Sequence, residues 1–398
     1  MTFDITIIGG GIVGLSAAWQ WQRRFPRMKL LVLEKEAAPG RHQTGHNSGV
    51  IHAGVYYAPG SLKAGLCKQG LRETVRFCKE NRIPYEQCGK LLVATDPLES
   101  QRLQALYRRC RENGIDGELL DAAALKTREP NIRGSGAIYV RDTGIVDFKK
   151  ICERLGQLIR AGGGEIRLNT RVSAISENDR TLTLKTDGGE INTAFLICCA
   201  GLQADRLVRA HGLEADFRII PFRGEYYRLP AGKSDLIRHL IYPIPDPALP
   251  FLGVHLTRTI DGGISVGPNA VLGWKREGYD RFNFSLADSG DMLAYPGFWK
   301  LLSRHLGYGL AEMKNSWWKR GYLRQVRKYC PRLALSDLLP YPSGVRAQAV
   351  LADGTLVHDF HFAESPRSLH VCNAPSPAAT SALPIGAYIC DRLAAKMS

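Results

Sequence analysis

A chain of 398 residues with 44% hydrophobic and 23% charged residues has the composition of a folded globular protein, and its length allows two or three domains. It contains no low-complexity tract, no internal repeat, no apolar run close to the ~20 residues that span a bilayer, and no N-terminal stretch resembling a secretory signal. The formal net charge of +15 favours anionic partners, namely a small acid, an anionic membrane or a nucleic acid. Ten cysteines without a C-x-x-C pair indicate reduced structural thiols in a cytoplasmic protein, and we expect no metal site.

The chain begins with a strand, a glycine-rich turn and a helix. Residues 3–8 form an apolar run rich in β-branched residues, which is typical of a buried parallel strand. Gly9, Gly11 and Gly14 then give the pattern G-x-G-x-x-G. These glycines permit a tight turn, let the backbone approach a pyrophosphate, and let the helix pack closely on the strand. The helix N-terminus adds unpaired N–H groups and a partial positive charge for the same anion.

Glu34 completes this unit and indicates the class of cofactor. It follows a second apolar strand at 30–33 and lies 20 residues after Gly14. At this position a carboxylate can accept hydrogen bonds from both ribose hydroxyls of an adenosine. It would repel the 2′-phosphate of NADP, so FAD and NAD both fit the motif. The sequence therefore predicts an ADP-containing cofactor.

Helices and strands alternate along the next part of the chain. A glycine- and histidine-rich loop covers 41–57, and the pattern predicts helices over 61–82, 97–113, 121–126 and 147–161. Strands are predicted over 90–95, 165–168, 170–176, 181–186 and 193–198. The last of these strands leads into Ala200 and Gly201, and such a small-residue turn is where an open α/β sheet binds its ligand.

Nucleotide-binding features occur at the start of the chain, near 165–205 and near the C-terminus. This order predicts an α/β protein with a Rossmann-like FAD-binding domain and an inserted α+β substrate domain that contains a mainly antiparallel sheet. The expected cofactor domain is discontinuous and comprises 1–80, 145–205 and 344–398. The expected substrate domain comprises 81–144 and 206–343.

Several motifs follow one another along the chain. They are H-Q-T-G-H-N-S-G-V-I-H-A-G-V-Y-Y at 42–57, P-G-S-L-K-A at 59–64, I-P-F-R-G-E-Y-Y at 220–227, H-L-I-Y-P-I-P-D-P-A-L-P-F-L-G-V-H-L-T-R at 239–258, V-G-P-N-A at 266–270, M-K-N-S at 313–316, K-Y-C-P-R-L at 328–333, G-V-R-A-Q-A-V at 344–350 and C-N-A-P-S-P-A-A-T-S-A at 372–382. Together they resemble the L-2-hydroxyglutarate dehydrogenase/oxidase family, within the D-amino-acid oxidase or glycerol-3-phosphate dehydrogenase superfamily of FAD enzymes. The resemblance covers essentially the whole chain.

This resemblance implies an activity. The family oxidises L-2-hydroxyglutarate to 2-oxoglutarate by hydride transfer from C2 to flavin N5, and electrons pass to a quinone-linked chain or to oxygen. Such a reaction needs a flavin, a base for the hydroxyl proton and cations that orient the substrate carboxylate. The alternative is an FAD enzyme of another small hydroxy or amino acid, similar to glycerol-3-phosphate or glycine oxidases. A flavin-containing RNA-binding protein is a further alternative, but the chain has no RNA-binding fingerprint, and we expect no nucleic-acid partner.

The residues that would handle the substrate are predicted from the same resemblance. The candidate base is His52, in a segment that passes beside the isoalloxazine in the superfamily, and the second candidate is His255. Arg346 belongs to a G-x-R motif that commonly holds the substrate acid, and a guanidinium can bind a carboxylate with two hydrogen bonds. A second carboxylate needs a further cation or several hydroxyls, for which the candidates are Tyr57, Arg223, Tyr226, Tyr242 and Arg258.

The resemblance also predicts the contacts of FAD. They are Gly9, Gly11, Gly14, Glu34 and Lys35 in the first unit, Thr44 and Ser48 at the pyrophosphate or flavin, Val172 at adenine through its backbone, Ala200 and Gly201 at the pyrophosphate, and Ala379, Thr380 and Ser381 near the flavin pyrimidine. Small residues in that last loop allow close backbone contact. No cysteine stands in a flavin-attachment motif, so we expect non-covalent FAD.

A basic and aromatic segment lies at 314–328. It carries six basic residues and no acidic residue, with Trp317, Trp318, Tyr322 and Leu323 between them. The pattern suits a membrane interface, where each Lys or Arg near an anionic leaflet contributes ~1 kcal/mol. It equally suits a solvated basic helix whose tryptophans pack into the substrate domain. With the net charge, it leads us to expect a cytoplasmic protein that binds peripherally to the cytoplasmic face of the inner membrane and reduces a quinone.

Overall fold

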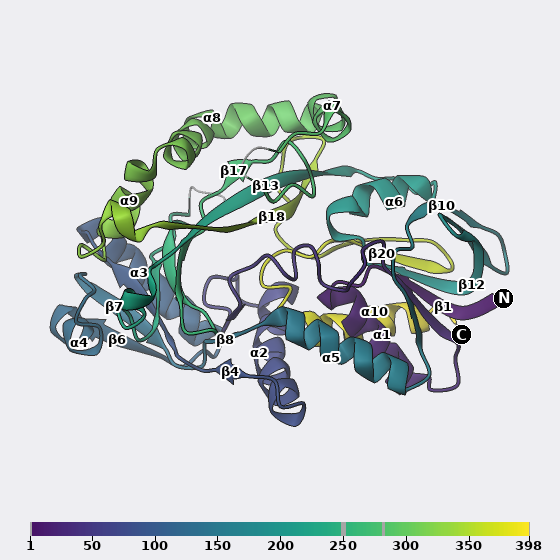
Figure 1. Ribbon diagram of the computed structural model, residues 1–398, viewed down its shortest axis with the longest axis horizontal. Helices are drawn as coiled ribbons and strands as arrows, with labels where there is room; N and C mark the ends of the chain where they lie inside the picture. The colour runs from purple at the N-terminus through teal and green to yellow at the C-terminus, as the bar shows by residue number, and fades with distance from the viewer. Residues whose placement is uncertain (1, 248–251, 281–282, 398) are drawn as a thin grey trace.

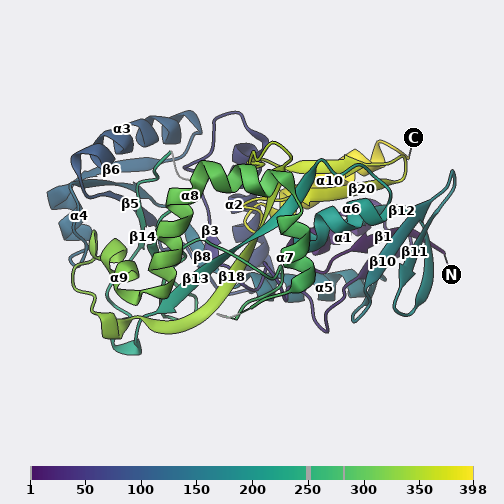
Figure 2. The ribbon, with the colours of Figure 1, turned by 90° about the horizontal axis from the view of Figure 1, so that it is seen from above.

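The structure is a computed structural model that describes residues 2–247, 252–280 and 283–397. Within these residues the chain forms an eight-stranded, a nine-stranded and a three-stranded sheet. The two large sheets lie toward opposite ends of the long axis, and the lobe on the right of Figure 1 contains β1 and α10 (Figures 1 and 2). The α/β fold class with a Rossmann-like sheet and a mainly antiparallel second sheet is confirmed.

Parallel strands form the centre of the eight-stranded sheet, in the order β9-β2-β1-β12-β20. They are β1 (Thr2–Ile8), β2 (Leu30–Leu33), β9 (Glu165–Arg167), β12 (Gly189–Cys198) and β20 (Ser368–Asn373). The antiparallel strands beside them are β10 (Val172–Glu177), β11 (Leu182–Thr186) and β19 (His361–Glu364). Because the central strands are parallel, their carboxyl ends meet at one edge, where ligands bind in such sheets.

Helices cover both faces of this sheet. α1 (Ile12–Arg24), α5 (Phe148–Ala161) and α10 (Ala382–Ala394) share one apolar core with Ile5 and Ile7 of β1. On the other face, Leu207 of α6 (Ala204–Ala210) packs against the apolar residues of β10, β11 and β12. The centre of the sheet is therefore buried on both sides, which explains why β2 and the second half of β1 read as continuous apolar runs.

The nine-stranded sheet runs in the order β17-β13-β16-β15-β14-β5-β7-β6, and β18 pairs with β13. The bounds are β5 (Lys90–Ala94), β6 (Gly117–Asp121), β7 (Gly136–Val140), β13 (Phe217–Arg228), β14 (Leu240–Pro243), β15 (His255–Arg258), β16 (Ile264–Gly267), β17 (Val271–Leu272) and β18 (Leu339–Leu351). The longest pair, β13 with β18, runs from Phe217 opposite Leu351 to Arg228 opposite Leu339. β18 thus belongs to the second sheet on both sides of residue 344, the position at which the last segment of the expected cofactor domain begins.

The predicted helices begin at capping residues that the sequence supplies. They are α2 (Leu62–Glu80), α3 (Pro97–Glu112), α4 (Ala122–Arg128) and α5, and the side chains of Ser61, Asp96, Asp121 and Asp147 accept from backbone N–H groups in their first turns. The helices predicted over 61–82, 97–113, 121–126 and 147–161 are therefore confirmed. The small sheet, β3 (Val50–Ile51), β4 (Tyr85–Glu86) and β8 (Gly144–Val146), pairs residues from three distant parts of the chain.

The basic and aromatic segment spans the end of α8 (Pro296–Trp317) and α9 (Lys319–Arg327). Tyr322 and Leu323 are buried in the core of the second lobe. Trp318 is 51% exposed, which differs from the packing alternative, in which the tryptophans pack into the substrate domain. The side chains of Lys314 and Trp317 lie outside the described residues. None of the helices in the described part of the chain combines the length and hydropathy needed to cross a membrane.

The tightest packing between α1 and α10 depends on Gly386. A Cβ at this position would lie 2.6 Å from the carbonyl carbon of Ser16 and 2.8 Å from the amide nitrogen of Ala17. We expect Gly386→Ala to lower the free energy of unfolding by about 1–3 kcal/mol, because the two helices must move apart. Urea denaturation followed by circular dichroism measures this change.

Gly290 of α7 (Leu286–Leu293) provides the matched control. It lies inside a helix, and a Cβ there would meet nothing within 4 Å. Gly290→Ala should therefore leave stability unchanged or raise it by about 0.5–1 kcal/mol, since alanine loses less backbone entropy in a helix. Equal effects of the two substitutions would contradict the close contact at Gly386.

Candidate functional site

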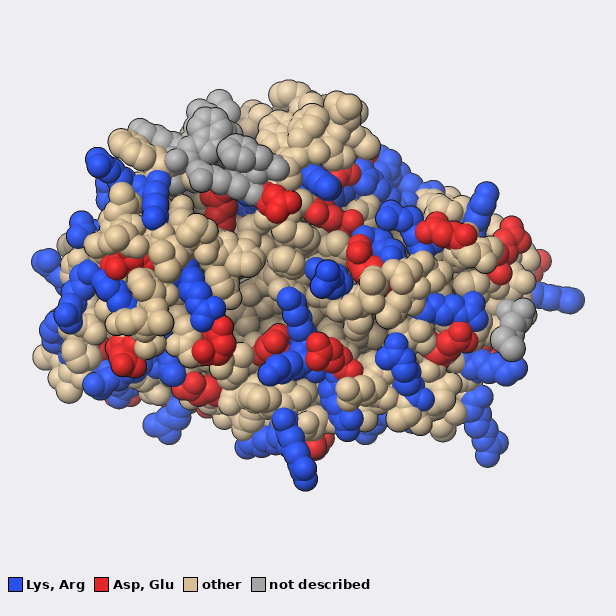
Figure 3. Space-filling model, viewed as in Figure 1, with Lys and Arg blue, Asp and Glu red and all other residues tan. Residues whose placement is uncertain are grey.

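A cavity of about 1030 Å³ extends from the turn after β1 to α3 in the second lobe. Figure 3 shows the corresponding face hollowed between the two lobes, with basic and acidic residues around the opening. Its volume slightly exceeds the range that is typical of ligand pockets, about 300–1,000 Å³. The cavity therefore has room for an extended ligand in the first lobe and a small molecule in the second.

The glycine turn leaves no room for side chains at this end of the cavity. A Cβ at Gly9 would lie 2.3 Å from the carbonyl oxygen of Cys199, and a Cβ at Gly14 would lie 2.0 Å from the carbonyl oxygen of Gly9. Gly9 also has a φ of +106°, which favours glycine. The backbone N–H of Ile12, at the start of α1, donates to Oγ1 of Thr44 (3.0 Å).

Glu34 is held by one backbone N–H of the glycine turn and by one backbone N–H that follows β2. Its Oε2 accepts from the N–H of Gly10 (2.7 Å), and its Oε1 accepts from the N–H of Glu36 (2.9 Å). A carboxylate oxygen can accept more than one hydrogen bond, so each retains capacity for a ribose hydroxyl. The side chain is thus fixed at the end of β2, the position that the motif predicts.

Most of the predicted cofactor residues line this cavity. Those that do are Gly9, Gly11, Gly14, Glu34, Lys35, Thr44, Ser48, Val172, Ala200, Gly201, Ala379 and Thr380. Ser381 does not line it, because it precedes α10 as the N-cap and lies fully buried beside Gly70 of α2. Of these three neighbouring residues, Ala379 and Thr380 thus line the cavity, whereas Ser381 packs against α2.

Lys35 lies in a network of charged groups beside Glu34. Its Nζ is 2.9 Å from Oε2 of Glu277 and 3.0 Å from Nε2 of His42, and it also pairs with Glu36. The hydrogen bond from Lys35 lowers the pKa of Glu36 to about 2. Glu36, His42 and Glu277 come close enough together to ligate a metal, but the ammonium of Lys35 already supplies the cation.

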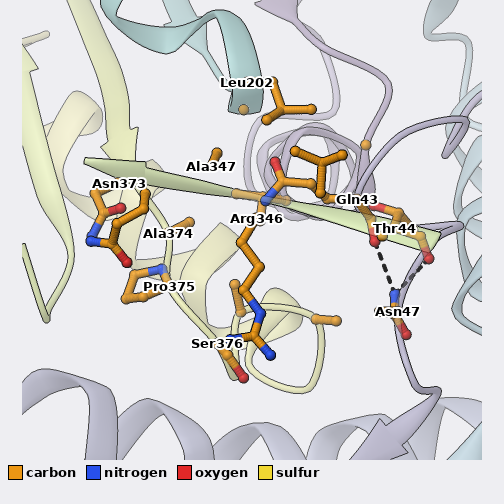
Figure 4. A pocket seen from close by; sticks show the side chains of 18 of the residues that line it. Gln43, Thr44, Asn47, Leu202, Arg346, Ala347, Asn373, Ala374, Pro375 and Ser376 are labelled. Atoms are coloured by element: carbon orange, nitrogen blue, oxygen red, sulfur yellow. Dashed lines mark hydrogen bonds between the residues drawn. The ribbon is translucent and has the colours of Figure 1, made fainter. Parts of the chain in front are cut away.

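The loop after β2 carries polar groups along the cavity wall. Asn47 donates from Nδ2 to the carbonyl oxygens of Gln43 (3.1 Å) and Thr44 (2.7 Å), as Figure 4 shows. His46 stacks on Tyr279 at 3.8 Å between ring centroids. These contacts hold the loop in a compact form next to the glycine turn.

Arg346 and two histidines come together at the other end of the cavity. Arg346 extends from β18 toward Ser376 (Figure 4). His52 and His255 also line the cavity, and the backbone N–H of His52 donates to Oγ1 of Thr380 (3.0 Å). This hydrogen bond joins the loop of His52 to the small-residue loop before α10. Tyr57, Tyr226 and Tyr242 line the same part.

Both histidines are neutral at physiological pH. Burial, followed by the charge of Lys90 and the proximity of His255, lowers the pKa of His52 well below 6.5. Burial and the charges of Arg346 and Lys90 lower the pKa of His255 to about 3. Nδ1 of His255 lies 2.9 Å from the carbonyl oxygen of Gly253, so this nitrogen is the donor and Nε2 keeps its lone pair. Each ring is therefore in the unprotonated form that a base requires.

Arg223 and Arg258, two candidates for a second carboxylate, do not line the cavity. Arg223 lies opposite Val345 in the β13–β18 pair, one position from Arg346, so it points to the other face of the sheet. There it donates to the carbonyl of Asp280 (2.9 Å) and to Glu225 (2.6 Å). Arg258 follows His255 by three positions in β15 and also faces away, where it pairs with Glu86.

Three cations that the sequence reasoning missed line the cavity near α3. Arg102 and Arg109 project from one face of α3, seven residues apart, and Lys63 projects from α2. Arg102 pairs with Asp246 at 3.1 Å, and Nζ of Lys63 lies 4.7 Å from the ring centroid of Tyr57. The seven-residue spacing of arginines in a helix is the signal that sequence reasoning had available.

Comparison with known proteins identifies relatives that match nearly the whole chain, including the parts that form the cavity. The family described as FAD dependent oxidoreductase matches residues 4–392. L-2-hydroxyglutarate dehydrogenase of Escherichia coli (strain K12) is 55% identical over 392 residues, which are 98% of this chain and 93% of that protein. The mitochondrial L-2-hydroxyglutarate dehydrogenase of Homo sapiens is 43% identical over 410 residues, which cover 98% of this chain and 89% of that protein.

A solved structure shares the fold. The L-alpha-glycerophosphate oxidase of Mycoplasma pneumoniae with FAD bound superposes with a TM-score of 0.80 at 21% identity, and the match covers 99% of this chain and 95% of that chain. At this identity the likeness concerns the fold alone. It extends over both lobes and therefore over the whole cavity.

Proposed function

Because the chain belongs to the FAD-dependent oxidoreductase family and is related along its length to L-2-hydroxyglutarate dehydrogenases, we propose that it oxidises L-2-hydroxyglutarate to 2-oxoglutarate with FAD. The observation that carries the proposal is one cavity that has a dinucleotide turn at one end and Arg346 with two neutral histidines at the other. FAD, when bound, supplies the acceptor for the two electrons and the hydrogen of C2.

The first lobe fits the adenosine and pyrophosphate parts of FAD. The turn at Gly9 and Gly14 has no room for a Cβ, so backbone can approach a pyrophosphate, and the N-terminus of α1 faces the same place. Glu34 is fixed for the ribose by two backbone N–H groups. Val172 and the pair Ala200 and Gly201 line the cavity beside them. In the proposal these residues bind the cofactor non-covalently.

The second lobe fits the substrate. Arg346 binds the carboxylate next to C2 with two hydrogen bonds and thereby orients the C2–H bond. His52 accepts the hydroxyl proton as the base, since its backbone is anchored to the small-residue loop at Thr380 and its ring is neutral. His255 is the second candidate for this role, because its Nε2 is free of the proton. Tyr57, Tyr226 and Tyr242 bound the same space.

Anaerobic mixing of the purified holoenzyme with substrates tests this function. L-2-hydroxyglutarate should bleach the flavin absorbance, and the D-isomer, L-malate, L-lactate, glycine and glycerol 3-phosphate should not. A fixed carboxylate and a fixed base let only one enantiomer direct its C2–H bond correctly. Equal reduction by both enantiomers, or faster reduction by glycerol 3-phosphate or glycine, would reject the proposal.

Arg346→Ala is the informative variant in the same assay. Its apparent Kd for L-2-hydroxyglutarate should rise by roughly 30-fold or more, since truncating one partner of a buried charged pair costs about 2–5 kcal/mol. Arg258→Ala is the matched control, because that guanidinium lies on the opposite face of β15 and should change the Kd by less than about twofold. An unchanged Kd in Arg346→Ala would remove this residue from the site.

His52→Ala should slow flavin reduction at saturating substrate by roughly 10²–10⁴-fold, because the hydroxyl proton loses its acceptor. The low pKa of His52 keeps the ring neutral down to pH values below 6.5, so the wild-type rate should stay constant from about pH 8 to 6.5 and fall only in more acidic buffer. Stopped-flow absorbance measures both. If His255→Ala carries the large effect and His52→Ala does not, the base is His255.

The proposal for the electron acceptor is a quinone reached at an anionic membrane. Exposed apolar side chains gather in and around α7 and α8, where Leu286 is 82%, Phe284 63% and Trp299 53% exposed. The exposed cations Lys300 and Arg304 lie on the same stretch of chain. Apolar side chains next to cations suit the interface of an anionic leaflet. These residues come before 314–328 in the chain, the segment for which the sequence suggests a membrane interface.

Sedimentation with vesicles tests the membrane surface. The protein should bind phosphatidylcholine vesicles only when phosphatidylglycerol is included, and salt should weaken binding. The double variant Leu286→Ser and Trp299→Ser should bind roughly tenfold more weakly or worse, since each side chain loses apolar burial. Leu98→Ser is the matched control, because Leu98 is 54% exposed on α3. Equal binding to neutral and anionic vesicles would contradict the proposal, as would an equal loss in the control.

A further inference from the structure

Lys90, the first residue of β5, is completely buried although it carries a cation. In the sheet it pairs with Leu240 of β14 and Val140 of β7. Among the residues that the structure describes, its Nζ has no hydrogen-bond partner. The ring centroids of Tyr56 and Tyr242 lie 4.9 and 5.0 Å from this nitrogen. The ammonium is thus enclosed between two aromatic rings.

No carboxylate compensates the charge of Lys90 within the described part of the chain. The ionisable groups that act on it are Cys67 of α2 and Cys110 of α3, both thiols. Aromatic faces attract a cation but do not neutralise it. Burial lowers the pKa of Lys90 to about 8, so the side chain is still largely charged at neutral pH. A neutral side chain of the same length would fill this space without the cost of burying a charge.

The two rings around Lys90 form part of the cavity wall. Tyr56 and Tyr242 both line the cavity, whereas Lys90 lies one layer behind them. The charge of Lys90 reaches into the cavity, because it contributes to the lowered pKa of His52 and of His255. The ring of His255 also stacks on Tyr242, with 3.9 Å between centroids. Lys90 is therefore placed directly behind the groups that would surround a substrate.

We propose that Lys90 is a positioning residue that makes the cavity selective for a dicarboxylate, by supplying through Tyr56 and Tyr242 the buried positive charge that compensates a second carboxylate when Arg346 holds the first. The inference rests on the proposed function and names how the second acidic group is recognised. In the free protein the cation is uncompensated, and a bound dianion removes that imbalance. Of the other cations at this end, Arg102 pairs with the carboxylate of Asp246, while Arg109 and Lys63 are oriented by the backbone carbonyls of Tyr56 and His358.

Binding of non-reacting acids to the oxidised holoenzyme tests this role without turnover. Glutarate carries two carboxylates, and pentanoate has the same carbon chain with one. Both are titrated while the visible flavin spectrum is recorded. The wild type should bind glutarate more tightly than pentanoate. Lys90→Met should weaken glutarate binding by roughly tenfold to fiftyfold, as expected for unit charges several ångström apart in a partly buried site, and pentanoate by less than threefold. Lys150→Met, an exposed lysine of α5, should change neither.

Two further readouts separate positioning from mere packing. Lys90→Met should melt at the wild-type temperature or above, because a buried charge is replaced by an apolar chain of similar shape. The preference of the wild type for glutarate should decline above about pH 8, as Lys90 loses its proton. It should be low and independent of pH in Lys90→Met. The other ionisable groups that face Lys90 do not titrate near pH 8. Burial raises the pKa of Tyr56, Tyr242, Cys67 and Cys110 and lowers the pKa of His52 and His255.

Several outcomes would overturn the inference. They are an equal loss of glutarate and pentanoate binding in Lys90→Met, an unchanged glutarate preference, a lower melting temperature with unchanged selectivity, and a wild type that does not prefer glutarate. The proposed function fails by a different observation, namely wild-type flavin that L-2-hydroxyglutarate does not reduce. The two failures are therefore distinguishable.

Discussion

The turn between β1 and α1 has no space for side chains, and the arrangement of the cavity depends on that constraint. Gly9 approaches the backbone of Cys199 at the end of β12, and Gly14 approaches the carbonyl of Gly9. These contacts bring the first turn of α1 against the ends of two parallel strands. A larger residue at either position would separate the helix from the sheet and remove the site where backbone groups can face a pyrophosphate. The first lobe is thus built around an approach that only glycine allows.

The cofactor end was predictable because its signals are local in sequence. Gly9, Gly14 and Glu34 lie within one βαβ unit, and their spacing alone implies that they meet at one sheet edge. The helices were predictable for the same reason, since Ser61, Asp96 and Asp121 cap the helices that follow them. Local patterns do not tell which face of an element becomes buried. The segment at 314–328 shows this limit, because Tyr322 and Leu323 pack inward, which only the position of the second sheet decides.

The substrate end was harder to predict because it is assembled from distant strands. Arg223 and Arg346 lie on neighbouring strands, but the register places them one position apart and so on opposite faces. His255 and Arg258 also face opposite sides of the sheet, because they lie three positions apart in β15. Sequence shows which cationic residues are present, whereas strand register decides which of them enter the cavity. For this reason the resemblance to a family located Arg346, and composition could not have excluded Arg223.

A buried ion pair fixes the position of a segment of the second lobe beside the cofactor end of the cavity. Arg276 pairs with Asp205 of α6, and it also binds Asp291 at 2.9 Å and the carbonyl of Leu202 at 3.0 Å. Both side chains of the main pair are nearly inaccessible, so loss of either partner would leave an uncompensated buried charge. The next residue is Glu277, which reaches Lys35 beside Glu34. The pair therefore determines where the chain between β17 and α7 meets the ribose end of the cavity. In this way one ionic contact joins the substrate lobe to the residues that would hold adenosine.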